Sequence, residues 1–377
     1  MRDAITEHLA KWKLILQSQH GFMAAKSCLT NLLEYLEVLT RLVDEGHQVD
    51  VVYLDFAKAF DKVPHQRLIM KMKAHGIMGK VVEWVEAWLS GRKQRVVLNG
   101  KMSSWEDVMS GVPQGSCLGP TLFIIFINDI DKAVDTVMGI ISKFADDTKV
   151  GRVVENDNDR EELQKDLNNL LEWSEKWQMM FNADKCKVLH FGKKNPHYSY
   201  TMGGHAPAGT VLEMVEEEKD VGVMISNSLK PTAQCVKAVK KANMVLGQMS
   251  RAFHYRDKST WIKLYKTYVR CHLEYSVQAW NPWLQADKNL LEAVQKRAVR
   301  MVSGLEGKEY HDRLREVGLT TLEERRVRGD MIETWKILNG KEDVSPATWF
   351  RMASEGEQTT RLGSHPLNLY KPQYAKS

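Results

Sequence analysis

The sequence has few cysteines, and their spacing excludes two common ways of stabilising a small domain. Five cysteines lie far apart in 377 residues, at positions Cys28, Cys117, Cys186, Cys235 and Cys271. Their number is odd and no Cys-x-x-Cys pair occurs, so we expect neither a disulfide scaffold nor a zinc cluster. This usage suits a reducing compartment, and we expect the protein inside the cell, in the nucleus, the cytoplasm or both.

Long apolar runs and a secretion signal are also missing. The longest apolar run, Leu122–Ile127, is far shorter than the roughly 20 residues that cross a bilayer. The N-terminus is charged from its first residues and has no apolar signal core. We therefore expect no membrane partner. A hydrophobic fraction of 43% is ample for two or three folded domains, which excludes disorder for most of the chain.

The net charge of +5 is small, but it is unevenly distributed. Residues 231–300 contain 13 Lys and Arg against 4 Asp and Glu, which is a local net charge of +9. A basic lobe of this kind suits a polyanion such as nucleic acid. A solvated helical surface explains the same composition, so charge alone leaves both interpretations open.

Hydrophobic periodicity predicts an α+β region followed by helices alone. Strand patterns end near residue 228, and only helical periodicity continues from Pro231 onward. The expected helices cover residues 5–16, 27–45, 65–75, 80–91, 117–132, 157–177, 232–252, 257–275, 284–303 and 321–338. The expected strands cover residues 48–56, 140–144, 148–153, 186–191 and 221–225, and a further hairpin turns at Asn99-Gly100.

Acidic residues stand at the ends of two expected strands. Asp55 follows the run Val51–Leu54, and Asp146 and Asp147 lie at the tip of an apolar hairpin. If the two strands are neighbours in one sheet, the carboxylates converge and can bind hard divalent cations such as Mg²⁺. The simpler alternative is turn chemistry at Asp146 and Asp147, which Asp favours, and a capping role for Asp55.

The order of several sequence blocks resembles the reverse transcriptase domain of non-LTR retrotransposons, in particular the jockey-like LINE elements. The blocks are Gln19–Phe22, Leu54–His65, Ser110–Ile130, Phe144–Thr148, Phe181–Gly192 and Lys219–Ile225. The resemblance implies a right-hand polymerase fold, whose palm is an antiparallel sheet with helices on one face. Family members also carry an N-terminal endonuclease and complete fingers, so an N-terminally truncated copy is expected here.

The resemblance also implies a division of the chain into lobes. Partial fingers would cover residues 1–48, and the palm would cover residues 49–64 and 106–228, with an insertion at 65–105. A helical thumb would follow at 229–304, then a helical extension at 305–345 and a loosely ordered tail at 346–377.

Catalytic roles follow from the same resemblance. Asp55, Asp146 and Asp147 match the catalytic carboxylates that hold two Mg²⁺ ions, or Mn²⁺, and the backbone carbonyl of Phe56 would assist. Asp55 and Asp146 would be essential and Asp147 more tolerant of change. Lys185 matches the lysine proposed to protonate the pyrophosphate leaving group. An ordinary exposed lysine remains the alternative.

Other positions match residues that bind the incoming nucleotide. Phe60 would lie beneath its sugar and exclude a ribose 2′-hydroxyl, although a core aromatic is the simpler interpretation. Pro113, Gln114 and Gly115 match the loop that contacts the nucleotide and the templating base. Lys26 is the remaining basic candidate for the triphosphate.

The basic helices after residue 231 would form the thumb and follow duplex phosphates. The candidate contacts are Lys237, Lys240, Lys241, Lys263, Lys266 and Arg270. Trp261, Tyr265 and Tyr268 are interleaved with them. Their spacing of four and three residues is more typical of a core stripe than of a base-stacking platform.

These matches imply an RNA-directed DNA polymerase that extends a DNA 3′-hydroxyl on an RNA template by two-metal nucleotidyl transfer. Its partners would be an RNA template, a DNA primer or target, and dNTPs. A missing endonuclease or fingers lobe would be supplied elsewhere. A catalytically inactive nucleic-acid-binding relic of a retroelement is the alternative. An RNA polymerase of the same palm family is disfavoured by Phe60 and by the block around Asp146.

Overall fold

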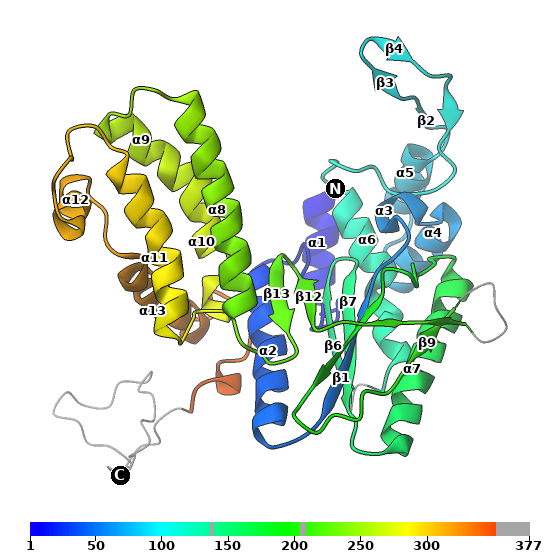
Figure 1. Cartoon of the computed structure of the whole chain (residues 1–377). Coiled ribbons are helices and arrows are strands. Elements are labelled where there is room, and N and C mark those ends of the chain that lie inside the picture. Colours follow the sequence, from blue (N-terminus) through cyan, green and yellow to red (C-terminus); the bar gives the residue numbers. More distant parts are fainter. Residues whose placement is uncertain (136–138, 204–208, 352–377) are drawn as a thin grey trace, which may run out of the picture. The chain divides into compact units, whose positions relative to one another are not determined.

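The chain divides into two compact units in the computed structural model, which describes residues 1–135, 139–203 and 209–351 (Figure 1). The first unit comprises residues 1–23 and 39–221, and the second comprises residues 24–38 and the chain from Gly222 onward. Most of the loosely ordered tail expected at 346–377 lies outside the described residues. Each unit is considered below by itself.

A five-stranded sheet forms the centre of the first unit. Its strand order is β11 (Glu213–Met214), β8 (Lys187–Phe191), β1 (Val49–Leu54), β7 (Asp147–Val153) and β6 (Gly139–Phe144). Strand β1 is antiparallel to both neighbours, β7 and β8. All six residues of β1 are buried, as expected for an apolar run in the middle of a sheet. The sequence predicts β1, β6, β7 and β8 within two residues of their bounds.

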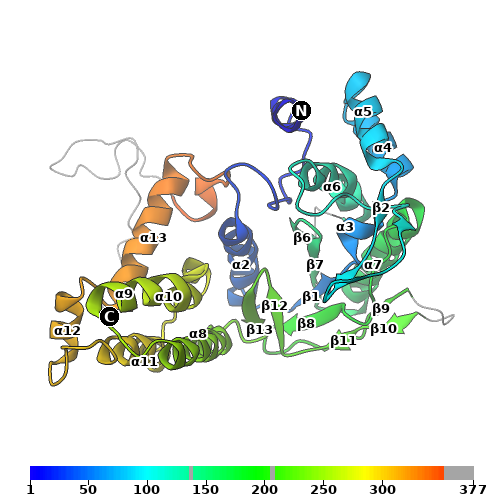
Figure 2. The ribbon, with the colours of Figure 1, turned by 90° about the horizontal axis from the view of Figure 1, so that it is seen from above.

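Helices cover one face of this sheet (Figure 2). The main ones are α6 (Gly119–Ile127), which continues as the 3-10 helix η1 (Asn128–Ala133), and α7 (Asp157–Trp177). Val52, Val150 and Val188 form a cross-strand row that packs into the same core as these helices. The α+β class and the palm-like layout predicted from the sequence are confirmed, and the sheet is antiparallel except at its edge, where β11 is parallel to β8.

Shorter elements complete the first unit. They are α1 (Arg2–Lys11), α3 (Ala59–Lys62), α4 (His65–Ala74), α5 (Lys80–Leu89), β9 (Thr201–Met202), β10 (Thr210–Val211) and β12 (Glu217–Asp220). Helix α3 has only four residues and was not predicted. Helix α2 (Cys28–Asp44) begins in the second unit and ends in the first.

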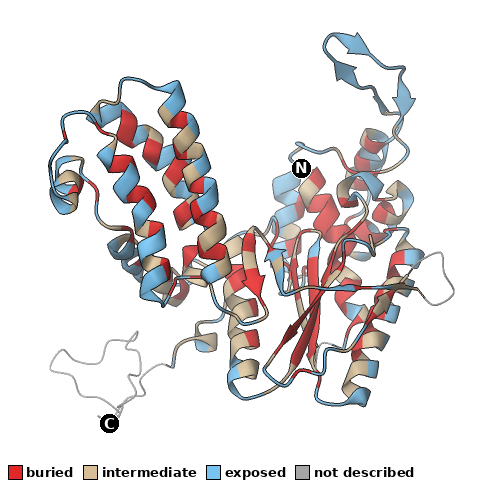
Figure 3. Cartoon of the chain, in the orientation of Figure 1, coloured by how far each residue is buried: buried red, intermediate tan, exposed pale blue. Residues whose placement is uncertain are grey.

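An exposed ribbon extends from the first unit after α5. It contains β2 (Lys93–Gln94), β3 (Val97–Leu98), β4 (Lys101–Met102) and β5 (Glu106–Asp107), and every residue of these strands is exposed (Figure 3). The predicted turn at Asn99-Gly100 joins β3 to β4, and both residues have positive φ angles, as a tight hairpin turn requires.

Helices dominate the second unit. They are α8 (Thr232–Ala252), α9 (Lys258–Leu264), α10 (Arg270–Glu274), α11 (Gln285–Arg300), α12 (Tyr310–Glu316) and α13 (Leu322–Leu338), with strand β13 (Val223–Ser226) and the 3-10 helices η3 (Val277–Ala279) and η4 (Pro346–Thr348). The single helix expected at 257–275 is interrupted by a π-helical segment, η2 (Tyr265–Val269). None of the helices in the described part of the chain combines the length and the hydropathy of a membrane-spanning segment.

The aromatic stripe of the second unit lies largely in its core. Trp261 and Tyr265 are 1% and 0% exposed. The indole N–H of Trp261 donates to the carbonyl of Ala298 at 2.9 Å, and the hydroxyl of Tyr265 donates to Gln295 Oε1 at 3.0 Å. The core interpretation is therefore confirmed for these two residues, whereas Tyr268 is exposed.

Candidate active site

Strands β1 and β7 bring the predicted catalytic carboxylates to one end of the sheet. Leu54, the last residue of β1, pairs with Thr148 of β7, so Asp55 and Asp147 lie at the same edge on neighbouring strands. Asp146 directly precedes Asp147, in the turn between β6 and β7. The prediction that the two strands are neighbours is confirmed, although 91 positions separate Asp55 from Asp146 in the sequence.

Burial and neighbouring negative charges raise the pKa values of two carboxylates at this edge, Asp146 and Asp147. Burial, followed by the negative charge of Asp55, raises the pKa of Asp146. Asp147 reaches solvent, yet desolvation by the surrounding chain, then the charges of Asp146 and Asp220, raise its pKa to about 6. Burial and nearby negative charge therefore disfavour ionisation of Asp146 and Asp147, and a cation at this edge would offset both effects.

Lys185 lies beside the first of these carboxylates. Its Nζ is 3.5 Å from Oδ2 of Asp55, and a turn places it there, because its backbone N–H donates to the carbonyl of Asn182. The backbone N–H of Asn182 donates in turn to the carbonyl of Asp55 at 2.8 Å. Lys185 remains well exposed, so it is free to contact a ligand at the carboxylate edge.

A small cavity of about 110 Å³ adjoins the carboxylates. Asp55, Asp147 and Lys185 line it, together with Lys149 and Asp220. Lys149 and Asp220 form a buried ion pair that sequence reasoning missed. A charged residue inside a buried strand needs a partner, so the position of Lys149 in β7 indicates that an acidic partner exists. The sequence around Lys149 does not indicate that this partner is Asp220.

The donor set suits a divalent cation. Within the described residues, none donates a hydrogen bond to Oδ2 of Asp55, and Asp146 and Asp147 offer further carboxylate oxygens with raised pKa values. Oxygen ligands of this kind are those that Mg²⁺ and Mn²⁺ prefer. Over the described ranges, however, no three His, Cys, Asp or Glu side chains are already gathered around one point.

Phe56, Phe60, Gln114 and Gly115, which are predicted to contact the nucleotide, lie in the first unit. None of them lines the small cavity beside the carboxylates. The ring of Phe60 stacks on Phe123 of α6 with centroids 4.3 Å apart. Gln114 is exposed and donates from Nε2 to Oδ1 of Asp61 at 3.3 Å, and Gly115 has open space around its Cα. Phe56 is buried and stacks on Phe181 with centroids 4.4 Å apart.

A family comparison identifies the domain around this site. A model of the family described as "Reverse transcriptase (RNA-dependent DNA polymerase)" matches residues 1–242, which is more than half of the chain. The chain belongs to the reverse transcriptase family. The resemblance drawn from the sequence blocks is thereby confirmed.

Curated relatives of this reverse transcriptase chain come from mobile elements. It is 28% identical over 315 residues to "RNA-directed DNA polymerase from mobile element jockey" of Drosophila funebris, covering 80% of this chain and 33% of that protein. It is 22% identical over 344 residues to "Probable RNA-directed DNA polymerase from transposon BS" of Drosophila melanogaster, covering 86% and 36%. The predicted kinship with non-LTR elements is confirmed. The chain spans about a third of the length of these relatives.

Among solved structures, the reverse transcriptase chain is similar to a telomerase from Candida albicans in complex with a fragment of telomeric RNA. That likeness has a TM-score of 0.45 at 11% identity, and it covers 85% of this chain and 58% of the telomerase.

The remaining predicted contacts of the reverse transcriptase lie in the second unit. Burial lowers the pKa of Lys26, and the negative charges of Glu34 and Asp343 partly offset that shift. Arg270 is half-buried and forms an ion pair with Glu274 at 3.4 Å. The other candidates lie on α8 and along α9 and η2. They are the exposed Lys240, Lys241, Lys263 and Lys266, and the half-buried Lys237.

Replacing Asp147 with asparagine is expected to stabilise the cation-free reverse transcriptase at neutral pH. The folded pKa of about 6 lies above the ordinary value of 3.8, so the stability contributed by Asp147 is full below pH 3.8 and is lost as the pH rises through 6. Asparagine does not ionise, so the variant avoids this loss of stability. Because the side chain is exposed to screening solvent, the gain in Tm should be only about 2 °C.

The measurement is thermal unfolding of both proteins in EDTA at pH 4.0 and pH 7.5. We expect the variant to be more stable at pH 7.5 and no more stable than the parent at pH 4.0. Equal differences in Tm at the two pH values would contradict the raised pKa of Asp147.

Proposed function

We propose that this reverse transcriptase chain is the polymerase part of a retrotransposon RNA-directed DNA polymerase. The single observation that supports it best is the convergence of Asp55, Asp147 and Lys185 around one cavity at the edge of the sheet, beside Asp146. The 3′-hydroxyl of a DNA primer on an RNA template would attack the α-phosphorus of a dNTP. The bond to the β-phosphate breaks, and pyrophosphate leaves.

The three aspartates would hold two Mg²⁺ ions, or Mn²⁺, with the backbone carbonyl of Phe56 as a further ligand. When bound, such ions activate the attacking hydroxyl and stabilise the leaving oxygen. Lys185 would deliver a proton to the departing pyrophosphate. Its position 3.5 Å from Asp55 supports this role, because it would bring the ammonium group close to phosphates bound at the carboxylate edge.

Template binding would use a second, larger cavity of the first unit. Its volume is about 760 Å³, and Lys58, Lys62, Arg92 and Lys93 line it together with Gln114. Basic side chains that track a backbone are typical of single-strand binding. Gln114 and Gly115 would then contact the nucleotide and the templating base, and Lys26 would contact the triphosphate.

The helices from residue 229 to 304 would act as the thumb and hold the primer–template duplex. Lys240, Lys241, Lys263 and Lys266 are exposed, as phosphate contacts must be, and such contacts give salt-dependent, sequence-independent binding. Lys237 and Arg270 would contribute from half-buried positions.

Further lobes complete the proposed assignment. Residues 1–48 would belong to the fingers, residues 49–64 and 106–228 would form the palm, and residues 65–105 would be an insertion between them. An endonuclease and the rest of the fingers would be supplied by other segments or chains.

Primer extension tests this proposal. The purified chain is incubated with an RNA template, a labelled DNA primer, dNTPs and Mg²⁺, and the primer length is followed. Stepwise extension that depends on both the template and the cation is the expected result. Binding of the duplex without incorporation would instead support the inactive relic.

Replacing Phe60 with valine should relax sugar selection. The aromatic ring is held in place by its stacking on Phe123, and valine would leave room for a ribose 2′-hydroxyl. We expect the ratio of kcat/KM for dNTP over rNTP to fall at least about tenfold, which corresponds to 1.4 kcal/mol.

Single-nucleotide incorporation with each nucleotide measures that ratio. Phe60→Tyr is the matched control, because it keeps the ring and should keep selection. An unchanged ratio in Phe60→Val would assign Phe60 to the core alone.

A further inference from the structure

A buried glutamine contacts the turn that carries the catalytic carboxylates. Gln19 is 1% exposed and lies beside β6, where its residue forms a parallel bridge with Lys143. Its Oε1 accepts the backbone N–H of Ala145 at 2.8 Å and that of Gly21 at 2.7 Å. Its Nε2 donates to the carbonyl of Ala145 at 3.3 Å. One side chain therefore satisfies both polar groups of the Ala145 backbone.

The turn needs such support because of its conformation. Ala145 has a φ of 58°, in the left-handed region that costs a non-glycine residue roughly 1 kcal/mol or more. It is also buried, so its backbone groups would otherwise lack partners. Asp146 directly follows Ala145 in the sequence, so the direction of its side chain depends on the Ala145 peptide that Gln19 holds.

The segment that carries Gln19 fits closely against the turn. A Cβ added to Gly21 would lie 2.3 Å from the backbone nitrogen of Ala145, which is too short for any side chain. Backbone hydrogen bonds of 2.9 Å join Lys143 to Ser18 and His20 to Lys143 on the two sides of Gln19. The glutamine cannot move far without displacing the hairpin.

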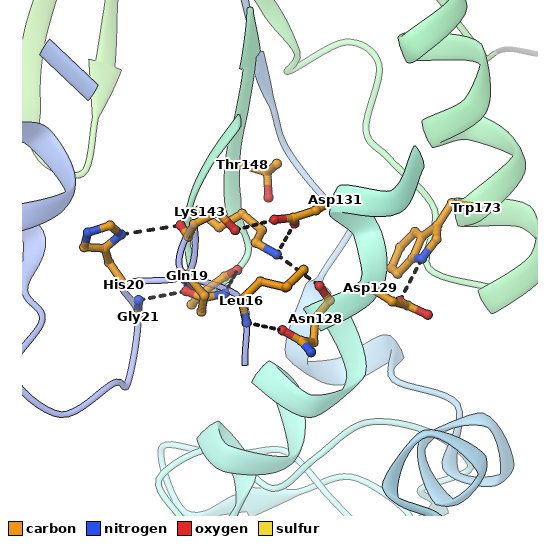
Figure 4. Close-up of polar contacts among 12 residues, drawn as sticks. Leu16, Gln19, His20, Gly21, Asn128, Asp129, Asp131, Lys143, Thr148 and Trp173 are labelled. Atoms are coloured by element: carbon orange, nitrogen blue, oxygen red, sulfur yellow. Dashed lines mark hydrogen bonds and ion pairs between the residues drawn. The ribbon is translucent and has the colours of Figure 1, made fainter. Parts of the chain in front are cut away.

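Further polar contacts hold the segment that carries Gln19 against η1. Lys143 is fully buried and forms an ion pair with Asp131 of η1, to which Ser18 Oγ also donates a hydrogen bond. Asn128 accepts the backbone N–H of Leu16 at 2.9 Å (Figure 4). The position of Gln19 is thus set by η1, which supplies both Asn128 and Asp131.

We infer that Gln19 is a positioning residue, which holds the Ala145 peptide so that Asp146 and Asp147 face a bound divalent cation. It does not touch the cation or the substrate. This inference rests on the proposed function for the reaction, but its first consequence is for cation binding, which is measured without catalysis. Removing partners of this kind typically weakens metal affinity or activity by about 10–100-fold.

The test compares Gln19→Met and Gln19→Asn with the parent chain. Methionine keeps the volume but has no amide, and asparagine keeps the amide on a stem one methylene shorter, which cannot reach Ala145. We expect both variants to bind Mn²⁺ at least about tenfold more weakly in titration calorimetry. In primer extension, kcat should fall about 10²-fold, as for a small misplacement of reacting groups, with the KM for dNTP nearly unchanged.

Tyr200→Phe is the matched control for stability. It removes a buried hydrogen bond of 2.6 Å, from the hydroxyl of Tyr200 to Asp50, in the same unit but at the opposite end of β1. It should lower Tm without changing Mn²⁺ affinity. If the parent chain binds Mn²⁺ but incorporates no nucleotide, the proposed function is refuted. The role of Gln19 is then decided by the Mn²⁺ affinities of the parent chain and its variants.

Three results would overturn the inference. One is parent-like Mn²⁺ affinity in Gln19→Asn, which decides the matter even if Gln19→Met does not fold. Another is an equal loss of affinity in Tyr200→Phe, which would indicate general destabilisation. The third is absence of Mn²⁺ binding by the parent chain.

Discussion

The Asp146→Asn variant is expected to lose about 10³-fold in the rate of nucleotide incorporation while it binds primer–template duplex as the parent does. Asparagine keeps the shape of the side chain but removes the charge that would hold a divalent cation. Loss of a single preorganised electrostatic group in an active site has effects of this size. Burial, followed by the negative charge of Asp55, raises the pKa of Asp146, and a bound cation would offset both effects.

Single-turnover primer extension measures this loss, and filter binding of the labelled duplex measures the affinity. Asp55→Asn should lose a comparable factor, and Asp147→Asn should lose less. Asp44→Asn is the matched control, because this carboxylate is exposed at the end of α2 and should leave the rate unchanged. Activity of Asp146→Asn within tenfold of the parent would exclude the proposed mechanism.

The Lys143→Ala variant should lose about 3–5 kcal/mol of unfolding free energy. Lys143 is 0% exposed and its ammonium group is paired with Asp131. It also donates to the carbonyl of Asn128 at 3.3 Å. Alanine would leave the Asp131 carboxylate in the interior with no counter-charge, in addition to an unfilled volume.

Urea unfolding followed by tryptophan fluorescence measures the loss. The double variant Lys143→Met with Asp131→Asn removes both charges and should recover most of the stability, since neutral replacements of a buried pair are often tolerated. Lys240→Ala, at an exposed position, should change the free energy by less than about 0.5 kcal/mol. If Lys143→Ala were equally mild, the buried pair would not be coupled to folding.

Strong periodicity explains which elements could be predicted. Helices α7 and α8 have the bounds expected from the sequence, 157–177 and 232–252, because long amphipathic patterns are bounded by clear end signals. For α7 the signal is a capping box, in which Asn156 and Asp159 exchange side-chain and backbone hydrogen bonds. The pairing of β1 with β7 could also be anticipated, because carboxylates lie at the ends of both strands.

Contacts between distant segments could not be predicted. Nothing near Gln19 in the sequence indicates that it meets Ala145, and nothing near Lys149 indicates Asp220. Short elements such as α3 (Ala59–Lys62) and the ribbon strands contain too few residues to show a period. The inclusion of residues 24–38 in the second unit likewise depends on packing, which a local sequence pattern does not indicate.

The π-helical segment Tyr265–Val269 accounts for an unusual repeat in the buried residues. Trp261, Tyr265, Val269 and Leu273 are all buried at an interval of four residues. Four residues of an α-helix turn through about 400°, so a regular helix would rotate such a stripe by roughly 40° at each step. The wider turn of a π segment resets the helical phase and keeps the stripe on the core. An unbroken interval of four apolar positions is thus a sign of local underwinding that can be looked for in other helical sequences.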